Sequence, residues 1–428
     1  EYNGYKVYWS DGAQLPPHHA AAIAQEMARL DVFDDVKTMP YDQALAQGKI
    51  TLMGKETDEK FLAQVLDQIN DKQAVAQVAD TFTMVYTPFH GTGYQQIPYV
   101  LGQLGIQRLH CVPEQMVIDG SFPTVASPNP ETPESFALAQ KLAKEVGAQF
   151  ILGSDPDADR VAIQVRDKDG QYVQISGNQT GVLLLDYLIG AKQRAGTMPA
   201  HPVALKSLVT TNMARAVAEA NGVTCYDTFT GFKFMAEKKN QLEQAGQGHV
   251  IFSYEESIGY MIGDYVRDKD AVTASLLLTE MAAWYACQGM TLLDALEALY
   301  QKYGYYGEQT VNLVMPGLEG MAQMKAIMAA LRQSPPTQIA GTAVTCQQDY
   351  QSGQERQTAS GENRTMELVG SNVLSWTLAD GTTIVVRPSG TEPKIKVYVL
   401  TAGADGAQCR ERVDRYAAWA QTLKDLAR

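Results

Sequence analysis

Three aspartates separated by single residues occupy the segment Asp155-Pro156-Asp157-Ala158-Asp159-Arg160. Apolar runs enter it at 150–152 and leave it at 161–163, so we expect a tight acidic loop between two strands. Three carboxylates in one short loop repel one another unless a cation lies among them. The segment therefore predicts a site for a hard divalent cation, with Arg160 beside it to meet an anion. A solvated acidic turn is the alternative, and the apolar flanks disfavour it.

A second polar cluster, Tyr254-Glu255-Glu256-Ser257, follows the predicted strand 250–253. Open α/β sheets bind ligands at the carboxyl ends of their strands. Glu255 and Ser257 stand two residues apart, so in an extended segment both can face one side and hydrogen-bond sugar hydroxyls. The sequence favours equally the alternative that Glu255 and Glu256 cap the backbone after the strand.

The third cluster is Arg387-Pro388-Ser389-Gly390-Thr391-Glu392-Pro393-Lys394, between two predicted strands. Two hydroxyls, two cations and backbone N–H groups around Gly390 are typical of a phosphate-binding nest. The sequence holds no G-x-x-x-x-G-K-[ST] motif, so it does not predict nucleoside triphosphate binding. A plain surface hairpin would leave this concentration of phosphate-type donors unexplained.

Composition limits the classes of function. The 428 residues predict about three domains, and 45% hydrophobic residues are enough for sizeable cores. A net charge of −13 disfavours nucleic-acid and anionic-membrane partners, so an anionic substrate needs local basic pockets. No run reaches the length of a membrane span. The scattered, odd set of five cysteines, without a C-x-x-C pair, indicates a reducing cytoplasm (Cys111, Cys225, Cys287, Cys346 and Cys409).

Strand and helix patterns alternate from about residue 80, which predicts parallel α/β layers. Gly91-x-Gly93 is half of a dinucleotide fingerprint with Gln96 at the third glycine position, so we interpret it as a tight turn. The predicted helices are 17–30, 58–70, 133–146, 212–221 and 271–287, and the predicted strands are 82–86, 108–112, 149–152, 203–208 and 250–253.

The two ends of the chain do not show this regular alternation of strand and helix patterns. Strands at 308–314, 373–378, 383–386 and 395–400, with helices at 321–331 and 406–426, predict a C-terminal α+β unit. The polar stretch 347–363 has no periodicity, so we expect an exposed insertion there. At the other end, Asn3-Gly4 predicts a hairpin turn, and the absence of an initiator Met leads us to expect further protein before Glu1.

In combination, these motifs resemble those of the α-D-phosphohexomutase superfamily. The acidic segment resembles its metal loop, 254–257 its sugar-recognition loop, and 387–394 its phosphate-binding loop. Asn3-Gly4-Tyr5-Lys6 resembles the segment that follows the family's catalytic serine loop. The four motifs stand in the family's order and cover the whole chain. The segment 255–260 is similar to the phosphoglucomutase and phosphopentomutase branch.

The resemblance implies three related mixed-sheet α/β domains and a smaller α+β C-terminal domain around a central cleft. It places a remnant of the catalytic first domain at 1–60, the metal-loop domain at 61–175, the sugar-loop domain at 176–305 and the phosphate-loop domain at 306–428. It implies a cytoplasmic, Mg²⁺-dependent enzyme, monomer or dimer, that interconverts glucose 1-phosphate and glucose 6-phosphate through a phosphoserine and glucose 1,6-bisphosphate. Phosphomannomutase and phosphopentomutase are alternatives within this class.

The resemblance also implies residue roles. Lys6 would take part in proton transfer, and Arg160 would contact the phosphate in transfer. Mg²⁺ would be bound by Asp155, Asp157 and Asp159, and the substrate by Gly231, Lys233, Glu255, Ser257, Lys269, Arg387, Ser389, Gly390 and Thr391.

The sequence departs from the family pattern at one place. The family's T-A-S-H-N-P serine loop is absent, and Ser127-Pro128-Asn129-Pro130 lacks the Ser-His-Asn core. We therefore expect this polypeptide alone to lack mutase activity, and the full-length protein to have it. A non-catalytic phosphosugar-binding protein is the alternative from a different class.

Overall fold

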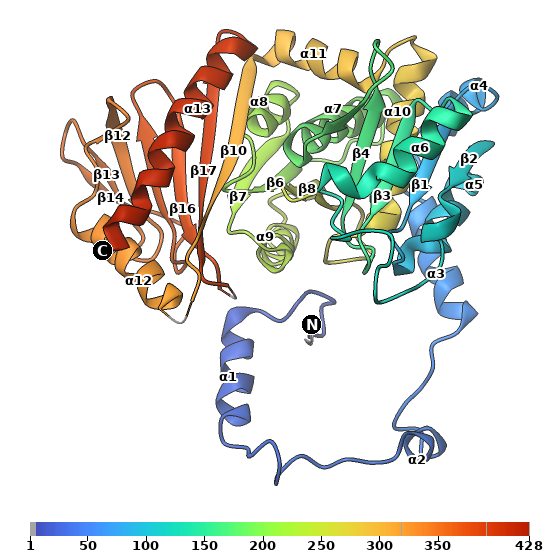
Figure 1. Cartoon of the computed structure of the whole chain (residues 1–428), viewed down its shortest axis with the longest axis horizontal. Coiled ribbons are helices and arrows are strands. Elements are labelled where there is room, and N and C mark those ends of the chain that lie inside the picture. Colours follow the sequence, from blue (N-terminus) through green and yellow to red (C-terminus); the bar gives the residue numbers. More distant parts are fainter. Residues whose placement is uncertain (1–5, 318, 391, 428) are drawn as a thin grey trace.

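Three β-sheets, each accompanied by helices, form the body of the molecule (Figure 1). The structure is a computed structural model that describes residues 6–317, 319–390 and 392–427. The predicted α/β fold class is confirmed. The turn predicted at Asn3-Gly4 lies outside the described residues. Within them, no helix is long and apolar enough to cross a membrane.

The first sheet carries the acidic loop. Its central strands are fully buried, and β1 pairs in parallel with β2 and β3. An antiparallel step then joins β3 to β4, with Ser154 opposite Val161, so the acidic loop closes a hairpin whose two strands are held in the core. The strand order is β2 (Arg108–Cys111), β1 (Thr83–Thr87), β3 (Phe150–Ser154), β4 (Val161–Arg166) and β5 (Tyr172–Ile175), with helices α5 (Gln96–Leu104) and α6 (Ala137–Val146).

The second sheet carries the predicted sugar loop at the carboxyl end of its central strand β8. Helix α7 (Gly177–Ala195) begins with a capping box formed by Ser176 and Gln179. The predicted helix 271–287 is confirmed as α10 (Ala271–Cys287), which is almost wholly buried. The remaining elements are β7 (Thr224–Thr228), β6 (Pro202–Ser207), β8 (His249–Glu255) and β9 (Gly259–Met261) in sheet order, with α8 (Met213–Ala220), α9 (Phe232–Gln244) and α11 (Leu292–Tyr303).

The C-terminal sheet has eight strands, and it is the largest of the three. Helices α12 (Gly320–Gln333) and α13 (Gly406–Thr422) share a core with its strands. The chain ends in a short 3-10 helix, Leu423–Ala427. The order is β10 (Tyr305–Val314), β17 (Lys394–Gly403), β16 (Thr383–Pro388), β15 (Leu374–Leu378), β12 (Thr342–Asp349), β13 (Gln354–Gln357) and β14 (Asn363–Thr365), and β11 (Gln338–Ile339) pairs with β12.

The stretch 347–363 is exposed or half-buried except at Gly353, as expected, but it forms strands of the sheet and not an insertion outside it. This stretch forms part of β12, all of β13 and the start of β14, with Gln348 opposite Glu355. Strands β13 and β14 lie at the edge of the sheet, where side chains on both faces can reach water. Backbone hydrogen bonds therefore hold them in place without the apolar alternation by which a strand is predicted.

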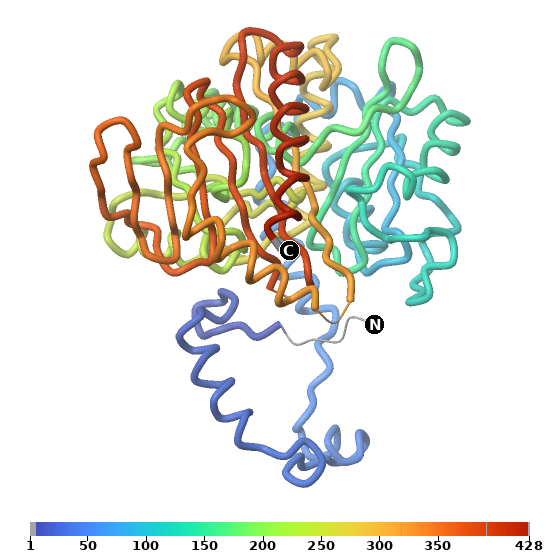
Figure 2. The backbone as a smooth tube through the Cα atoms, turned by 60° about the vertical axis from the view of Figure 1, so that its left-hand side comes forward, coloured from blue at the N-terminus to red at the C-terminus, as the bar shows by residue number. Residues whose placement is uncertain are grey.

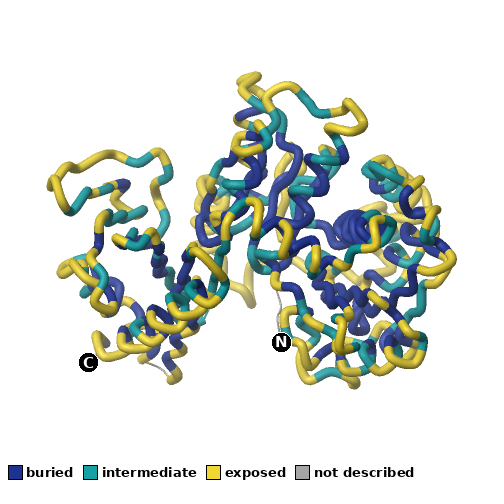
Figure 3. The backbone as a smooth tube through the Cα atoms, turned by 90° about the horizontal axis from the view of Figure 1, so that it is seen from above, coloured by how far each residue is buried: buried dark blue, intermediate teal, exposed yellow. Residues whose placement is uncertain are grey.

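The N-terminal segment, residues 6–54, contacts the body at its start, through Tyr8 and Ala13, and then extends away from it (Figures 1 and 2). Helix α1 (Pro17–Met27) has no buried residue, and α2 (Tyr41–Ala46) buries only Ala44. Large apolar side chains face solvent here, with Phe33 91% exposed. Buried residues concentrate in the body (Figure 3), which the chain enters through α3 (Lys55–Leu66) and α4 (Lys72–Val78).

Gly181 in α7 offers a test of the packing between this helix and the second sheet. A Cβ atom at Gly181 would lie 1.9 Å from Cε2 of the buried Tyr254, whereas at Gly190 of the same helix it would meet only the flexible Arg194 side chain, at 3.1 Å. We expect Gly181→Ala to lower the free energy of unfolding by about 1–3 kcal/mol. Gly190→Ala should leave it unchanged or raise it by up to about 1 kcal/mol. Urea unfolding followed by circular dichroism distinguishes them, and equal stabilities would contradict the packing.

Candidate functional site

The three aspartates of the acidic loop converge as predicted. One carboxylate oxygen from each of Asp155, Asp157 and Asp159 lies within 4.8 Å of the other two. Asp155 is only 1% exposed, Asp159 is half-buried and Asp157 is exposed. The loop turns through Ala158, whose φ of 56° is left-handed. Because the strands on both sides are buried, the body of the domain holds the carboxylates together.

Two lysines from distant parts of the chain donate to these carboxylates. Lys6 Nζ lies 2.8 Å from Asp157 Oδ2 and 2.9 Å from Asp159 Oδ2. Lys269 Nζ lies 2.7 Å from Asp159 Oδ2. Both residues that were predicted from the resemblance therefore lie at the acidic loop, where their ammonium groups offset its negative charge.

The electrostatics of the loop fit a small, hard cation. Burial raises the pKa of Asp155 to about 7, and the negative charge of Asp159 adds to the rise. Burial also opposes ionisation of Asp157, but the hydrogen bonds with Lys6 and Asp155 and the charges of Lys6 and Lys269 together outweigh it and lower the pKa of this carboxyl. For Lys6, burial likewise acts against the charge, and the hydrogen bonds to Asp157 and Asp159 raise the pKa above its usual value. Carboxylate oxygens are ligands that Mg²⁺ takes in proteins.

Arg160 is fixed by the loop that it follows. Its Nε donates to Asp155 Oδ2 at 2.8 Å, while Asp155 Oδ1 accepts from the backbone N–H groups of Arg160 at 2.9 Å and Asp159 at 3.1 Å. A terminal nitrogen of the guanidinium lies 3.9 Å from Glu131 Oε2. Arg160 is thus oriented, and its partly exposed fork retains N–H groups for an anion. Sequence reasoning missed Glu131, which stands in no motif.

The Gly91-x-Gly93 segment serves the acidic loop. A Cβ atom at Gly91 would lie 2.4 Å from the Cα atom of Pro156. The backbone N–H of Thr92 donates to the Pro156 carbonyl at 2.8 Å. Gly91 therefore allows the two backbones to approach closely, as the interpretation of this segment as a tight turn expects.

Hydrogen bonds join the acidic loop to the predicted sugar loop. The backbone N–H of Val161 donates to the Ile258 carbonyl at 3.1 Å, and Arg160 and Gly259 form an antiparallel bridge. Ile258 has a φ of 59°, which is strained for a β-branched residue. The backbone N–H of Ala271, at the start of α10, donates to the Ala158 carbonyl at 3.1 Å. Two loops from different sheets and the start of one buried helix thus form a single unit.

Gly231, Glu255 and Ser257 meet at the end of β8. Glu255 is 6% exposed, and its carboxylate accepts from the Gly231 backbone N–H and, at 3.4 Å, from the Ser257 hydroxyl. The side chains of Glu255 and Ser257 therefore meet, although residues 256–258 form a turn where the prediction assumed an extended segment. The backbone N–H that Glu255 caps belongs to Gly231, before α9, and not to the segment after β8. Burial raises the pKa of Glu255 to about 7; the charge of Glu256 adds to the rise, and those of Lys269 and Arg387 oppose it.

The segment 387–394 forms a small recess of about 160 Å³. Its Ser389 hydroxyl accepts from the Glu392 backbone N–H at 3.2 Å, and Gly390 has open space around it. Thr391 lies outside the described residues. Lys396 also lines the recess, and sequence reasoning did not single it out. Because side chains alternate along a strand with a period of two, Lys396 is expected on the same side as Lys394. Lining residues are Arg387, Pro388, Ser389, Glu392, Lys394 and Lys396.

Lys233 stands apart from the other predicted residues. Its Nζ lies 5.1 Å from the centre of the Phe234 ring. Among the residues that the structure describes, it makes no hydrogen bond or ion pair with the acidic loop, with Glu255 or with Arg387. Its predicted role in lining a cleft stays a prediction.

Comparison with known proteins gives three matches to family models, which cover most of the chain. They are the phosphoglucomutase/phosphomannomutase alpha/beta/alpha domain II over residues 59–170, domain III over 176–303, and the C-terminal domain over 311–416. The chain is 33% identical over 399 residues to the phosphoglucomutases of Staphylococcus haemolyticus and Staphylococcus aureus. These alignments cover 93% of this chain and 70% of each relative.

Solved structures share the fold. Parafusin, a phosphoglucomutase from Paramecium in its open form, matches with a TM-score of 0.60 and 17% identity, over 86% of this chain and 62% of that one. A phosphoglucomutase/phosphomannomutase family protein from Burkholderia thailandensis matches with a TM-score of 0.51 and 17% identity, over 84% and 65%. The chain thus spans just under two thirds of the length of these solved chains.

The buried Glu255 predicts a pH dependence of stability. Its pKa is raised to about 7 in the folded protein, so between pH 4.5 and 7 the folded state binds more protons than the unfolded state. The free energy of unfolding should therefore fall as pH rises across this window. We expect Glu255→Gln to make that slope shallower by up to one proton, or about 1.4 kcal/mol per pH unit. Urea unfolding from pH 5 to pH 8 measures it, and identical slopes in the two proteins would contradict the assignment.

Proposed function

We propose that this chain, which belongs to the phosphoglucomutase/phosphomannomutase family, carries the metal loop, sugar loop and phosphate clamp of a phosphoglucomutase. The observation that carries the proposal is the joining of the acidic loop to the sugar loop by the bond from Val161 to Ile258. Arg387 of the third motif acts electrostatically on Glu255 of the second, which supports a common binding region. The names of the curated relatives favour glucose over mannose or a pentose.

Phosphoryl transfer depends on positioning and charge neutralisation more than on covalent chemistry of the protein. In the proposal, Arg160 contacts the phosphate in transfer because Asp155 already orients its guanidinium. Asp155, Asp157 and Asp159 would hold Mg²⁺, which when bound would neutralise negative charge on phosphoryl oxygens. A lysine is protonated at neutral pH, and the contacts with Asp157 and Asp159 favour that form further, so Lys6 would enter proton transfer as a donor.

The remaining residues bind the sugar phosphate. Glu255 and Ser257 would hold two sugar hydroxyls, and the raised pKa of Glu255 lets its carboxyl act as donor or acceptor near neutral pH. The recess at Arg387, Ser389 and Lys396 would grip the phosphate that does not react. Glucose 1,6-bisphosphate would then be the intermediate and activator. A cytoplasmic location is part of the proposal, and the five free cysteines support it.

Metal and ligand binding test the proposal directly. We expect the chain to bind Mn²⁺, as a probe for Mg²⁺, and glucose 1,6-bisphosphate. Asp157→Asn should weaken Mn²⁺ binding by about tenfold or more, because it removes one charged ligand of three. The matched control is Asp169→Asn, in the exposed turn after β4. Calorimetric titration and the electron paramagnetic resonance signal of free Mn²⁺ measure both, and equal affinity in Asp157→Asn would refute the metal assignment.

Turnover tests the role of the serine loop. The 428 residues contain no Ser-His-Asn triplet, so we expect them, expressed alone, to lack mutase turnover. The assay couples glucose 6-phosphate formation to NADPH production, with mannose and ribose 1-phosphates tested in parallel by product analysis. Turnover of any of these sugar phosphates by the verified 428-residue chain would contradict the expectation.

A further inference from the structure

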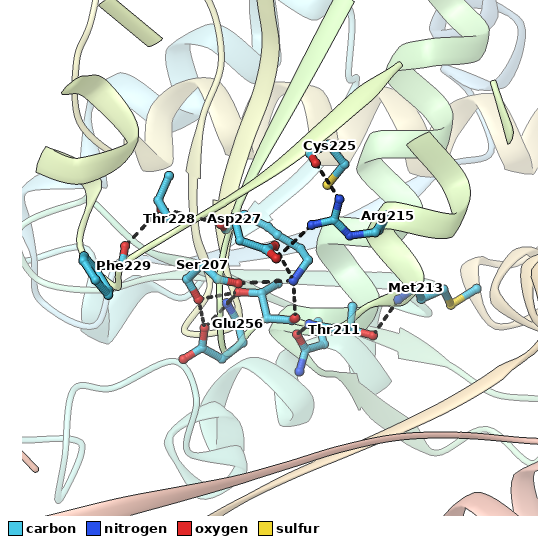
Figure 4. A network of polar contacts seen from close by, with 12 residues as sticks. Ser207, Thr211, Met213, Arg215, Cys225, Asp227, Thr228, Phe229 and Glu256 are labelled. Carbon is cyan, nitrogen blue, oxygen red and sulfur yellow. Dashed lines mark hydrogen bonds and ion pairs between the residues drawn. The ribbon is translucent and has the colours of Figure 1, made fainter. Parts of the chain in front are cut away.

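Lys206, at the end of β6, is a buried cation that none of the three motifs contains. Its side chain is 1% exposed, and its Nζ lies 2.9 Å from Asp227 Oδ1. The same ammonium group donates to the carbonyls of Thr210 at 3.0 Å and Ser207 at 3.4 Å. Figure 4 shows the surrounding network, with Ser207, Asp227 and Glu256 labelled. The ammonium group of Lys206 therefore holds the loop 207–211 in place through hydrogen bonds to its carbonyls.

The loop 207–211 holds the carboxylate of Glu256. The Ser207 hydroxyl donates to Glu256 Oε2 at 3.1 Å (Figure 4). The Thr210 hydroxyl donates to the same oxygen at 3.0 Å and accepts from the Glu256 backbone N–H at 3.2 Å. Glu256 stands between Glu255 and Ser257. Because its side chain and its backbone are both tied to the loop, the direction of its two neighbours depends on where the loop lies.

The same loop packs on the C-terminal unit. Leu208 and Val209 form one buried apolar cluster with Phe229 and with Val373, Val385 and Tyr398. Val385 and Tyr398 belong to β16 and β17, the strands on both sides of the phosphate-type segment. The loop 207–211 thus contacts the sugar loop and the strands that carry the clamp.

Removal of the ammonium group should loosen this loop without unfolding the domain. Asp227 would keep a partner, since Arg215 Nη2 lies 2.8 Å from its Oδ2, and its side chain is 37% exposed. The Thr210 carbonyl would lose its donor inside the protein, which favours movement of the loop. Lys206 therefore positions the loop 207–211.

We propose that Lys206 is a positioning residue for sugar-phosphate binding. It acts through the loop 207–211 on Glu256, and so sets Glu255 and Ser257 and seats the clamp strands against the sugar loop. This inference rests on the proposed function, because it assigns the bound molecule to the same site.

The test compares two buried lysines in the full chain. Lys206→Met should weaken glucose 1,6-bisphosphate binding about tenfold, the scale of one buried hydrogen bond to a charged group, while Mn²⁺ affinity stays unchanged. Lys239 is the matched control: it is also 1% exposed and lies 2.6 Å from both Glu243 and Asp264. Lys239→Met should lose stability and keep the affinity of the unsubstituted chain.

Thr210→Val extends the test, because it removes the hydroxyl that holds Glu256 and keeps Lys206. Thr210→Val should also weaken glucose 1,6-bisphosphate binding. If Lys206→Met does not fold, the result for Thr210→Val decides the test. Unchanged affinity in these variants, or an equal loss in Lys239→Met, overturns the role of Lys206 and leaves the proposed function standing. Failure of the unsubstituted chain to bind glucose 1,6-bisphosphate overturns both.

Discussion

Repulsion between like charges is the constraint on which the candidate site depends. Three carboxylates lie within 4.8 Å of one another at the tip of a buried hairpin, and Glu131 stands near the arginine that follows them. Such a cluster is stable only when cations and N–H groups surround it. Here they come from distant parts of the chain: Lys6 from the N-terminal segment, Lys269 from the approach to α10, and Arg160 from the loop itself.

The second feature of the site is that backbone hydrogen bonds join loops that belong to different parts of the fold. The Ile258 and Ala158 carbonyls accept from Val161 and Ala271, and both acceptor residues adopt left-handed conformations that cost free energy outside glycine. Buried strands and the buried helix α10 fix the chain on either side of these residues. The core therefore maintains a geometry at the loops that their local sequences would not adopt alone.

Local patterns made much of this predictable. The acidic loop, α10 and the end of β8 were expected from apolar runs and polar residues adjacent in sequence, and the structure bears these out. Contacts between distant residues had no such signal. Lys206 follows the apolar run of β6 without any motif, and Glu131 meets Arg160 only through tertiary packing. The edge strands β13 and β14 were missed because exposure on both faces removes the alternation that marks a strand.

The contact of Lys6 with the acidic loop has a consequence for thermodynamic linkage. Lys6 closes a ring of chain that includes the exposed helix α1, so its contact with Asp157 and Asp159 restricts a segment with little packing of its own. A divalent cation that took the same oxygens would remove this one restraint, while the contacts of Tyr8 with Asp268 and of Ala13 with Arg267 would stay. Linkage is reciprocal, so a stronger contact of Lys6 with these two carboxylates would weaken cation binding by the same factor. The contact of the N-terminal segment with the acidic loop and the binding of a cation there would then be thermodynamically coupled.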